Sequence, residues 1–541
     1  MDLGIFDYIV SGVQAVFLGP AAFELFGIGV STTVLMVFVG FLAGIIVGAT
    51  PGLAGPMAMA VATPILIGIF GVGTDALLPV LGCLIGIMKG ATIGGAVPAI
   101  LFNTPGTPDA LTTTYDGFPM ARQGQAGKAL RVAHLSSVTG DTFSDIVLIF
   151  TAPFLAIWVE RYLGFPEKAA LILLSLSFIA ALVGNNVWKG LLAAAFGMFI
   201  AMIGTGSGAP RDPFAERLTL GWDPLAGGLD VGVVVIGVLI LGEVFKSVED
   251  LVRDGIERRQ DMKHKTGASQ GITRSELADL APTVGISAVI GTVIGALPGV
   301  GSTLAATLGY RAAGLRKRQE GEPSLGDGNQ RGVAATEAAN SAVSGANLIP
   351  VLTLGIPGNA AAVFLILAMD SIDGFNPGAA AMVLRTNELN PELVMAFGIF
   401  TAMLLANAFN WTIGGLFMRR VGVLSRVPKH ILMPIVLLLA LTATYAQLTS
   451  MTAIVLTCVF GLIGYLMRKV NMSVLPFVIA FILTRGENGL EVAMRKAFAA
   501  TGSDPWFLFS SPVSIGFMVA SVLVIVASFT LPKFTSSRSH R

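Results

Sequence analysis

The chain of 541 residues is 54% hydrophobic and only 12% charged, and its mean hydropathy is +0.78. Soluble domains average about 25% charged residues, so this chain lacks the polar surface that a soluble globule needs. A net charge of +1 argues against a nucleic-acid partner. Two cysteines, Cys83 and Cys458, lie within apolar runs and suggest neither a disulfide nor a metal framework. The composition indicates an all-α polytopic membrane protein.

Apolar runs long enough to cross a bilayer recur along the chain. In chain order they cover residues 26–48, 76–102, 142–160, 166–184, 187–205, 225–245, 280–297, 333–356, 392–418, 430–446, 449–467 and 511–531. Shorter apolar pieces lie at 54–72, 301–310, 358–370 and 473–484. We expect about 12 transmembrane helices, one for each long run. The polar, basic stretch 246–276 is interpreted as a cytoplasmic linker between a first membrane repeat, 1–245, and a second, 277–541.

Two apolar segments, one in each half, end in nearly the same phrase. "GATPGLAG" begins at Gly48, and "GALPGVGS" begins at Gly295, at a constant offset of 247 residues. Farther along, Pro98 with Pro105-Gly106 corresponds to Pro350 with Pro357-Gly358. "DGFP" at 116–119 and "DGFNP" at 373–377 follow in the same order. This ordered set predicts an internal repeat.

Basic residues suggest how the two repeats lie in the membrane. The stretch 277–310 is flanked by the basic linker on one side and by Arg311, Arg316, Lys317 and Arg318 on the other. If both flanks are cytoplasmic, this segment folds back on itself. Its counterpart, 24–75, has no Lys or Arg. The asymmetry predicts two inverted-topology repeats with broken or re-entrant helices at the Pro-Gly motifs, the plan of many secondary transporters.

The first Pro-Gly motif of each repeat is predicted to form half of a ligand site. A helix broken inside the membrane exposes N–H and C=O groups that need a partner. The half-helix after the break directs N–H groups at the gap, which suits a carboxylate, while opposing carbonyls suit a small cation. The residues assigned to substrate binding here are Pro51, Gly52, Pro298, Gly299, Gly301 and Ser302.

The second Pro-Gly motifs add polar side chains. We assign further substrate contacts to Asn103, Thr104, Pro105, Gly106, Thr107, Ser344, Asn347, Pro357, Gly358 and Asn359. Cation coupling, to Na⁺ or H⁺, is assigned to Asp109, Glu337, Asn340 and Thr353. The alternative for any one Ser, Thr or Asn is that it caps a half-helix or joins neighbouring helices.

Lys89 and Glu337 are ionisable residues within or beside apolar segments. Lys89, inside 76–102, needs a cavity or a partner. It would bind an anionic substrate, pair structurally with Glu337 or Asp75, or extend to the membrane surface. Glu337 is either a proton or cation carrier or an ordinary acidic residue near a helix start.

No enzyme motif is present, and we predict that the chain is not an enzyme. HExxH, GxSxG, Walker A and a dinucleotide-binding GxGxxG motif are all absent. His134 and Asp141 lie on a segment that we interpret as amphipathic or interfacial. Without an ATP site, transport must draw on an ion gradient.

The repeated phrases, together with "PAILFNTPGTPDA" and "ATEAANSAVSGANLIPVLTLGIPG", resemble the large membrane subunit of tripartite tricarboxylate transporters, the TctA type. The resemblance covers about Phe26 to Phe529. It implies a multi-pass subunit in a bacterial inner membrane, with a small membrane subunit (TctB type) and a periplasmic substrate-binding protein (TctC type) as partners. It also implies ion-coupled symport of an organic anion, citrate-like compounds being the namesake substrates. A passive anion channel and a membrane-embedded enzyme remain the alternatives, and sliding and rocking mechanisms stay open.

Overall fold

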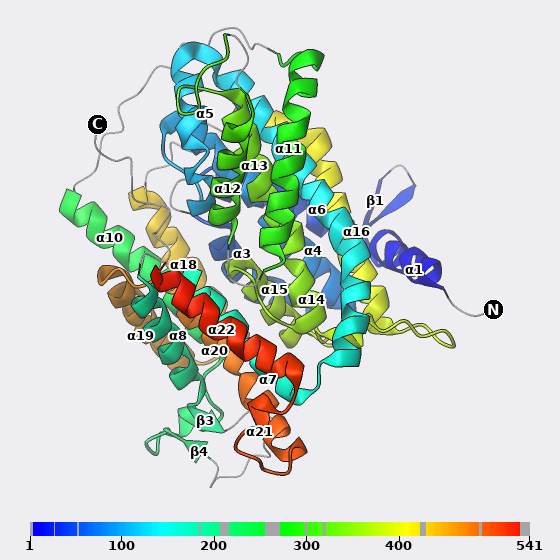
Figure 1. Cartoon of the computed structure of the whole chain (residues 1–541), viewed down its shortest axis with the longest axis vertical. Helices are drawn as coiled ribbons and strands as arrows, with labels where there is room; N and C mark the ends of the chain where they lie inside the picture. The colour runs from blue at the N-terminus through cyan, green and yellow to red at the C-terminus, as the bar shows by residue number, and fades with distance from the viewer. Residues whose placement is uncertain are drawn as a thin grey trace.

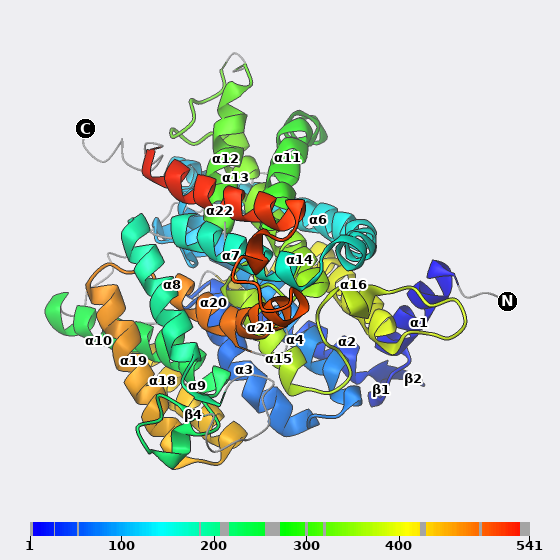
Figure 2. The ribbon, with the colours of Figure 1, turned by 60° about the horizontal axis from the view of Figure 1, so that its bottom comes forward.

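The structure is a computed structural model, and it describes residues 4–25, 27–50, 53–182, 186–205, 216–254, 271–297, 301–317, 321–421, 429–485 and 489–530. It is a helical assembly with two small hairpins, β1–β2 and β3–β4 (Figures 1 and 2). Within the described ranges, seven helical stretches are long and apolar enough to cross a membrane. They are Thr74–Phe102, Thr114–Tyr162, Val231–Arg253, Arg274–Gly295, Pro391–Met418, Met451–Lys469 and Pro512–Phe529. The predicted all-α membrane class therefore fits, while the number of crossings and the inverted topology stay predictions.

The N-terminal region packs at the edge of the molecule (Figure 1). Helix α1 (Ile5–Phe17) lies against α16 (Pro391–Phe409), and the hydroxyl of Tyr8 accepts the backbone N–H of Asn390 at 3.0 Å. Strands β1 (Ala21–Leu25) and β2 (Ile28–Ser31) follow. Helix α2 (Thr32–Gly48) begins only where Ser31 caps it, so the predicted span 26–48 starts too early. The apolar strand residues extend the hydropathy signal beyond the helix.

Helices α2 and α4 (Thr74–Phe102) pack along glycine-rich faces. A Cβ built at Gly44 would lie 2.4 Å from the carbonyl oxygen of Ile87, and one at Gly90 would lie 2.2 Å from that of Phe41. Small residues let membrane helices approach closely. Many of the glycines are thus explained by packing.

Both halves of the chain contain the predicted interruption. Helix α2 ends at Gly48 and α3 (Gly55–Phe70) follows, while α11 (Arg274–Gly295) is followed by α12 (Ser302–Leu315). Gly301, the N-cap of α12, has φ +79°, a left-handed conformation that favours glycine. Pro51, Gly52, Pro298 and Gly299 themselves lie outside the described residues.

A second helix ends at the later Pro-Gly motif in each half. Helix α4 ends at Phe102, and α13 (Gln330–Ala346) continues as α14 (Leu348–Leu354) before the second break. Helix α6 (Ala126–Tyr162) packs on α13 of the other half, and α16 packs on α4. The prediction of a span at 142–160 is too short, because α6 starts sixteen residues earlier as one continuous 37-residue helix. We call α2–α6 and α11–α17 the core group; its remaining elements are η1 (Pro108–Leu111), α5 (Thr114–Met120), η2 (Ala121–Gln125), α15 (Ala360–Ser371), η6 (Ala379–Met382), η7 (Asn410–Gly414) and α17 (Gly415–Val421).

The ends of the two halves form a second assembly, which we call the flanking group. It contains α7 (Phe165–Leu182), α8 (Val187–Ala201), β3 (Gly204–Thr205), β4 (Glu216–Arg217), η4 (Asp223–Leu225), α9 (Val231–Val235), η5 (Ile236–Leu241), α10 (Gly242–Asp254), α18 (Lys429–Leu448), α19 (Met451–Lys469), α20 (Leu475–Thr484), α21 (Leu490–Ala500), η9 (Phe507–Phe509) and α22 (Pro512–Thr530). Each half contributes to every pair: α22 packs on α7, α20 on α8, and α19 on η5 and α10 (Figure 2). Helix α10 runs into the predicted linker, of which residues 255–270 lie outside the described ranges.

Candidate substrate and ion site

Helix α13 is a polar helix buried in the centre of the core group. It packs against α6, α11 and α12 (Figure 1). Its polar residues Arg331, Thr336, Glu337, Asn340, Ser341 and Ser344 are all buried, as is Asn347 at its end. Polar groups inside a membrane protein mark a functional path or a paired network. This helix therefore holds the largest concentration of candidate site residues.

The broken segments meet one another around this helix. Thr303, in the first turn of α12, donates a hydrogen bond to Asp109 in η1 at 2.9 Å. A Cβ built at Gly106 would lie 2.1 Å from the carbonyl oxygen of Gly48, so the two breaks of the first half touch. In the second half, a Cβ at Gly358 would lie 1.9 Å from Oδ1 of Asn347. Glycine is required at Gly106 because a backbone oxygen occupies the space, whereas at Gly358 the space is taken by the side chain of Asn347.

Four predicted site residues serve their own local backbone. Asn359 caps α15 by accepting the N–H of Ala362 at 2.8 Å, and the Thr353 hydroxyl donates to Ile349 O at 2.6 Å. The Thr104 hydroxyl donates to Phe102 O at 3.1 Å, and Asn103 ends α4 in the left-handed conformation, with φ 53°. These contacts match the capping alternative.

Several other predicted site residues have buried polar side-chain atoms that make no hydrogen bond within the described part of the chain. Among the described residues, no hydrogen-bond partner is present for the buried atoms Thr107 Oγ1, Glu337 Oε2, Asn340 Nδ2 and Asn347 Nδ2. Buried polar groups almost always have a partner, and an unsatisfied one inside a membrane costs several kcal/mol. Two amide donors suit an anion, and a carboxylate oxygen suits a proton or cation. Pro105 and Pro357 lie at these breaks and have no side-chain hydrogen-bonding group, whereas Ser302, the first residue of α12, carries a hydroxyl.

Glu337 lies deep in this helix. It is the eighth residue of α13, beyond the first turn in which the helix dipole acts, so the helix-start interpretation does not explain it. Its Oε1 accepts the hydroxyl of Thr113, which comes from the first half. The side chain is completely buried. Glu337 is thus a carboxyl group shared by the two halves.

Lys89 pairs with residues that the sequence analysis did not assign. Its Nζ lies 2.7 Å from Asp141 Oδ1 and 2.8 Å from Asp145 Oδ2, and the lysine is 1% exposed. The predicted partners Glu337 and Asp75 are both wrong: Asp75 is exposed in the first turn of α4. Because Lys89 is already held by two carboxylates, a substrate anion would have to displace them.

Sequence reasoning missed Asp145 and Asn407 and misplaced Asp141. Asp141 and Asp145 are four residues apart and so share one face of α6. That spacing could have identified them had 126–162 been treated as one helix. Asn407 of α16 donates to Asp145 Oδ2 at 2.7 Å, and Ser344 donates to Asp141 Oδ1 at 2.6 Å. The segment predicted to be interfacial is buried here.

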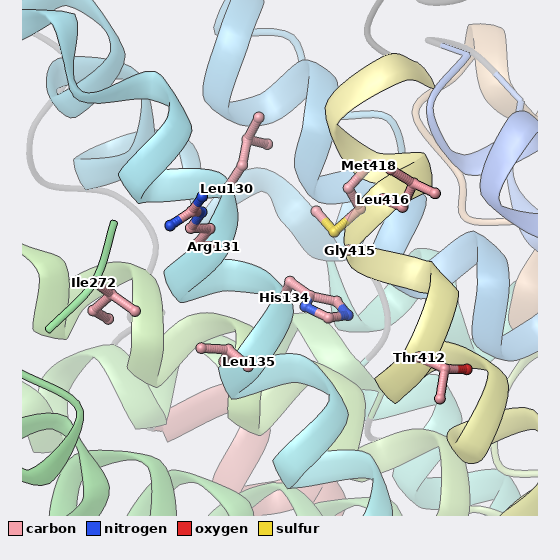
Figure 3. A pocket seen from close by; sticks show the side chains of 9 residues that line it. All are labelled: Leu130, Arg131, His134, Leu135, Ile272, Thr412, Gly415, Leu416 and Met418. Carbon is pink, nitrogen blue, oxygen red and sulfur yellow. The ribbon is translucent and has the colours of Figure 1, made fainter. Parts of the chain in front are cut away.

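His134, seven residues before Asp141 on α6, lies beside a separate cavity of about 390 Å³. Figure 3 shows it projecting from α6 toward the helix that bears Gly415 and Met418. Its Nε2 lies 2.9 Å from the carbonyl oxygen of Asn410. Other lining residues are Leu130, Arg131, Leu135, Ile272, Thr412 and Leu416. This environment is mostly apolar.

Comparison with known proteins identifies the family. The model of the Tripartite tricarboxylate transporter TctA family matches residues 34–479, which include both broken pairs and α13. The chain belongs to the TctA family. This membership confirms the resemblance seen in the motifs and makes the protein a multi-pass membrane component of a transporter.

Two relatives of this TctA-family chain come from Agrobacterium vitis. An "Uncharacterized 52.8 kDa protein in TAR-I ttuC' 3'region" is 27% identical over 508 residues, which cover 93% of this chain and 94% of the relative. An "Uncharacterized protein in TAR-II ttuC' 3'region" is 25% identical over 252 residues, 46% of this chain and 97% of the relative. No solved structure matches the chain.

Proposed function

We propose that this TctA-family chain is the large membrane subunit of a binding-protein-dependent secondary transporter that imports an organic carboxylate. The substrate is a tricarboxylate or a related di- or monocarboxylate, and Na⁺ or H⁺ is the coupling ion. A small membrane subunit (TctB type) and a periplasmic binding protein (TctC type) are its partners in a bacterial inner membrane. The proposal rests on one observation: α13 carries unpaired buried amide donors where the broken segments converge.

The carboxylate binds between the breaks. Amide donors of Asn340 and Asn347, both nearly fully buried, are available to an anion. Helix α15 begins just after Gly358, which lies against Asn347, and α12 packs on α13; the first N–H groups of both helices carry partial positive charge. Gly358 lets the backbone approach the Asn347 amide closely. Neutral donors of this kind bind a carboxylate and still let it leave.

The coupling ion binds beside the substrate at Glu337, with Asp109 and Asn340 as further candidate contacts. Glu337 has one unpaired carboxylate oxygen and is linked to the first half through Thr113. A proton or cation there removes a buried negative charge. Substrate binding next to the neutralised carboxyl group then costs less than binding next to a carboxylate. This difference couples the two ligands.

Alternating access slides the core group against the flanking group. The flanking group is tied together by polar contacts such as the ion pair of Arg468 with Glu243 at 2.9 Å. Toward the core it is contacted by α3 and α15, which pack on α18 and α20. Helix α3 follows the first break of the first half, and α15 follows the second break of the second half. Both helices are apolar. Apolar surfaces slide without leaving polar groups unpaired.

Uptake by the complex in proteoliposomes tests the proposal. The whole complex with its binding protein is assayed with labelled citrate and a set of di- and monocarboxylates, with and without Na⁺ and proton gradients. Accumulation that collapses when both gradients are removed supports ion-coupled symport. Equal uptake without gradients contradicts coupling, and flux that only equilibrates favours a passive channel.

Matched variants locate the site. Asn347→Ala removes an unpaired donor and is expected to abolish uptake, while Asn359→Ala removes only a helix cap and should retain most of it. His134→Ala should transport normally, since His134 faces a separate cavity. Complete loss in His134→Ala would favour the alternative of a membrane-embedded enzyme.

A further inference from the structure

Lys89, Asp141 and Asp145 form a buried cluster with one more carboxylate than cation. The three side chains come from α4 and α6, and they are joined by Ser344 of α13 and Asn407 of α16. Their exposed fractions are 1%, 3% and 1%. With all three groups ionised, the cluster carries a net charge of −1. An uncompensated charge in a protein interior costs several kcal/mol.

The surroundings do not supply the missing positive charge within the described residues. On α6 the nearest basic groups are His134 and Arg131, seven and ten residues before Asp141, or about 10 and 15 Å along the helix. Glu337 on α13 is a further carboxyl group, seven residues before Ser344. The other charged side chains that the structure describes on α6 and on the elements packed against it are engaged elsewhere or lie farther along: Asp75, Asp116, Arg122, Lys128, Glu160, Arg161, Arg274, Glu276, Asp279, Arg331, Glu392 and Arg420.

Unpaired oxygens show where one more hydrogen fits. Asp141 Oδ1 and Asp145 Oδ2 each accept two hydrogen bonds. In contrast, Asp145 Oδ1 and the Asn407 amide oxygen are buried without a donor in the described part of the chain. A Cβ at Gly345 would lie 2.3 Å from Asp145 Oδ1, so this oxygen faces α13 closely. The cluster thus contains two buried acceptor oxygens and, in the ranges that the structure describes, no donor for either of them. A proton bound to the cluster supplies a donor.

We propose that this cluster is a proton-binding site, with the proton held on the Asp145 carboxyl group and Lys89 retained as the permanent cation. The inference rests on the proposed function and adds a second ion site to it. A proton fits better than a metal ion, because the described residues contain no group of three or more His, Cys, Asp or Glu side chains able to hold a metal.

Protonation changes how the two halves are joined. The ionised Asp145 holds Lys89 of α4 and Asn407 of α16, while Asp141 holds Lys89 and Ser344 of α13. A neutral Asp145 binds Lys89 more weakly, and the pairing of Lys89 with Asp141 becomes a balanced ion pair. Protonation of the cluster therefore changes how tightly α4, α6, α13 and α16 are held together. These four helices form the centre of the core group.

Infrared difference spectroscopy of the purified complex across a pH series, without substrate, tests the proton directly. The wild type should show C=O stretching intensity of buried carboxylic acids, and Asp145→Asn should lose the component that belongs to Asp145. Glu337→Gln is the matched control and should leave it in place. In Lys89→Met, which removes the cation, the band should grow and persist to higher pH. Identical acid bands in wild type, Asp145→Asn and Asp141→Asn at every pH overturn the proposal.

Two further readouts separate this inference from the proposed function. Replacing choline by Na⁺ at fixed pH should leave the band unchanged; its loss would overturn the proton assignment. In proteoliposomes, Asp145→Asn should retain citrate exchange but lose accumulation driven by a proton gradient. Retained accumulation contradicts the proposal. A wild-type complex that transports nothing defeats the proposed function, while the spectroscopic result still decides the proton site.

Discussion

The carboxylate of Asp116, from the DGFP phrase of the first half, accepts the backbone N–H of Asn329 at 2.8 Å. The same oxygen accepts the N–H groups of Gly326 and Gly328. Asn329 caps α13, so the first half holds the loop that positions the polar helix of the second half. The site therefore depends on a contact between residues 213 positions apart.

Asp116→Ala is expected to destabilise the protein by about 3 kcal/mol, because two buried N–H groups and one partly buried N–H group lose a charged acceptor. Thermal unfolding in detergent measures the effect. Asp7→Ala is the control: it removes an exposed contact to Gly4 N at 2.7 Å and should cost less than about 1 kcal/mol. Equal losses in the two variants would contradict this role of Asp116.

Lys89→Met should be among the most destabilising single changes, at about 3–5 kcal/mol, because it leaves two buried carboxylates without their cation. Adding Asp145→Asn to it should recover part of the loss. Lys128→Met breaks the half-exposed pair with Glu276 and should cost at most about 1 kcal/mol. The comparison uses unfolding midpoints at neutral pH.

Gly44→Ala should separate α2 from α4 and cost about 1–3 kcal/mol, because the added Cβ meets the Ile87 carbonyl oxygen. Gly285→Ala, inside α11, is the matched control. A Cβ there meets nothing within 4 Å, so the higher helix propensity of alanine should make it neutral or stabilising by up to about 1 kcal/mol. A stable Gly44→Ala protein would show that the close helix approach is dispensable.

Burial raises the pKa of Asp230, which caps α9 by accepting the N–H of Val233 at 3.2 Å. A raised folded-state pKa means that ionisation costs stability as pH rises from the ordinary aspartate range through the folded-state value. Asp230→Asn keeps the cap and removes that cost. Its unfolding midpoint should exceed that of the wild type at neutral pH, and the advantage should vanish at low pH. An advantage that grows on acidification would contradict the sign.

Hydropathy located the helices because apolar length is a local property. The predicted run 76–102 coincides with α4, and 449–467 coincides with α19. The repeated Pro-Gly phrases likewise marked the interruptions between α2 and α3 and between α11 and α12. The same motifs indicated the family that the family model identifies.

The sequence by itself thus determined the membrane class, most helix positions and the family. Only the tertiary structure decided which buried groups meet, since Lys89 finds its partners 52 and 56 residues away on a different helix. It also decided the division into core and flanking groups, which depends on packing between the ends of the two halves. Periodicity and composition report how a segment meets apolar surroundings, whereas pairing between distant segments depends on the three-dimensional path of the whole chain.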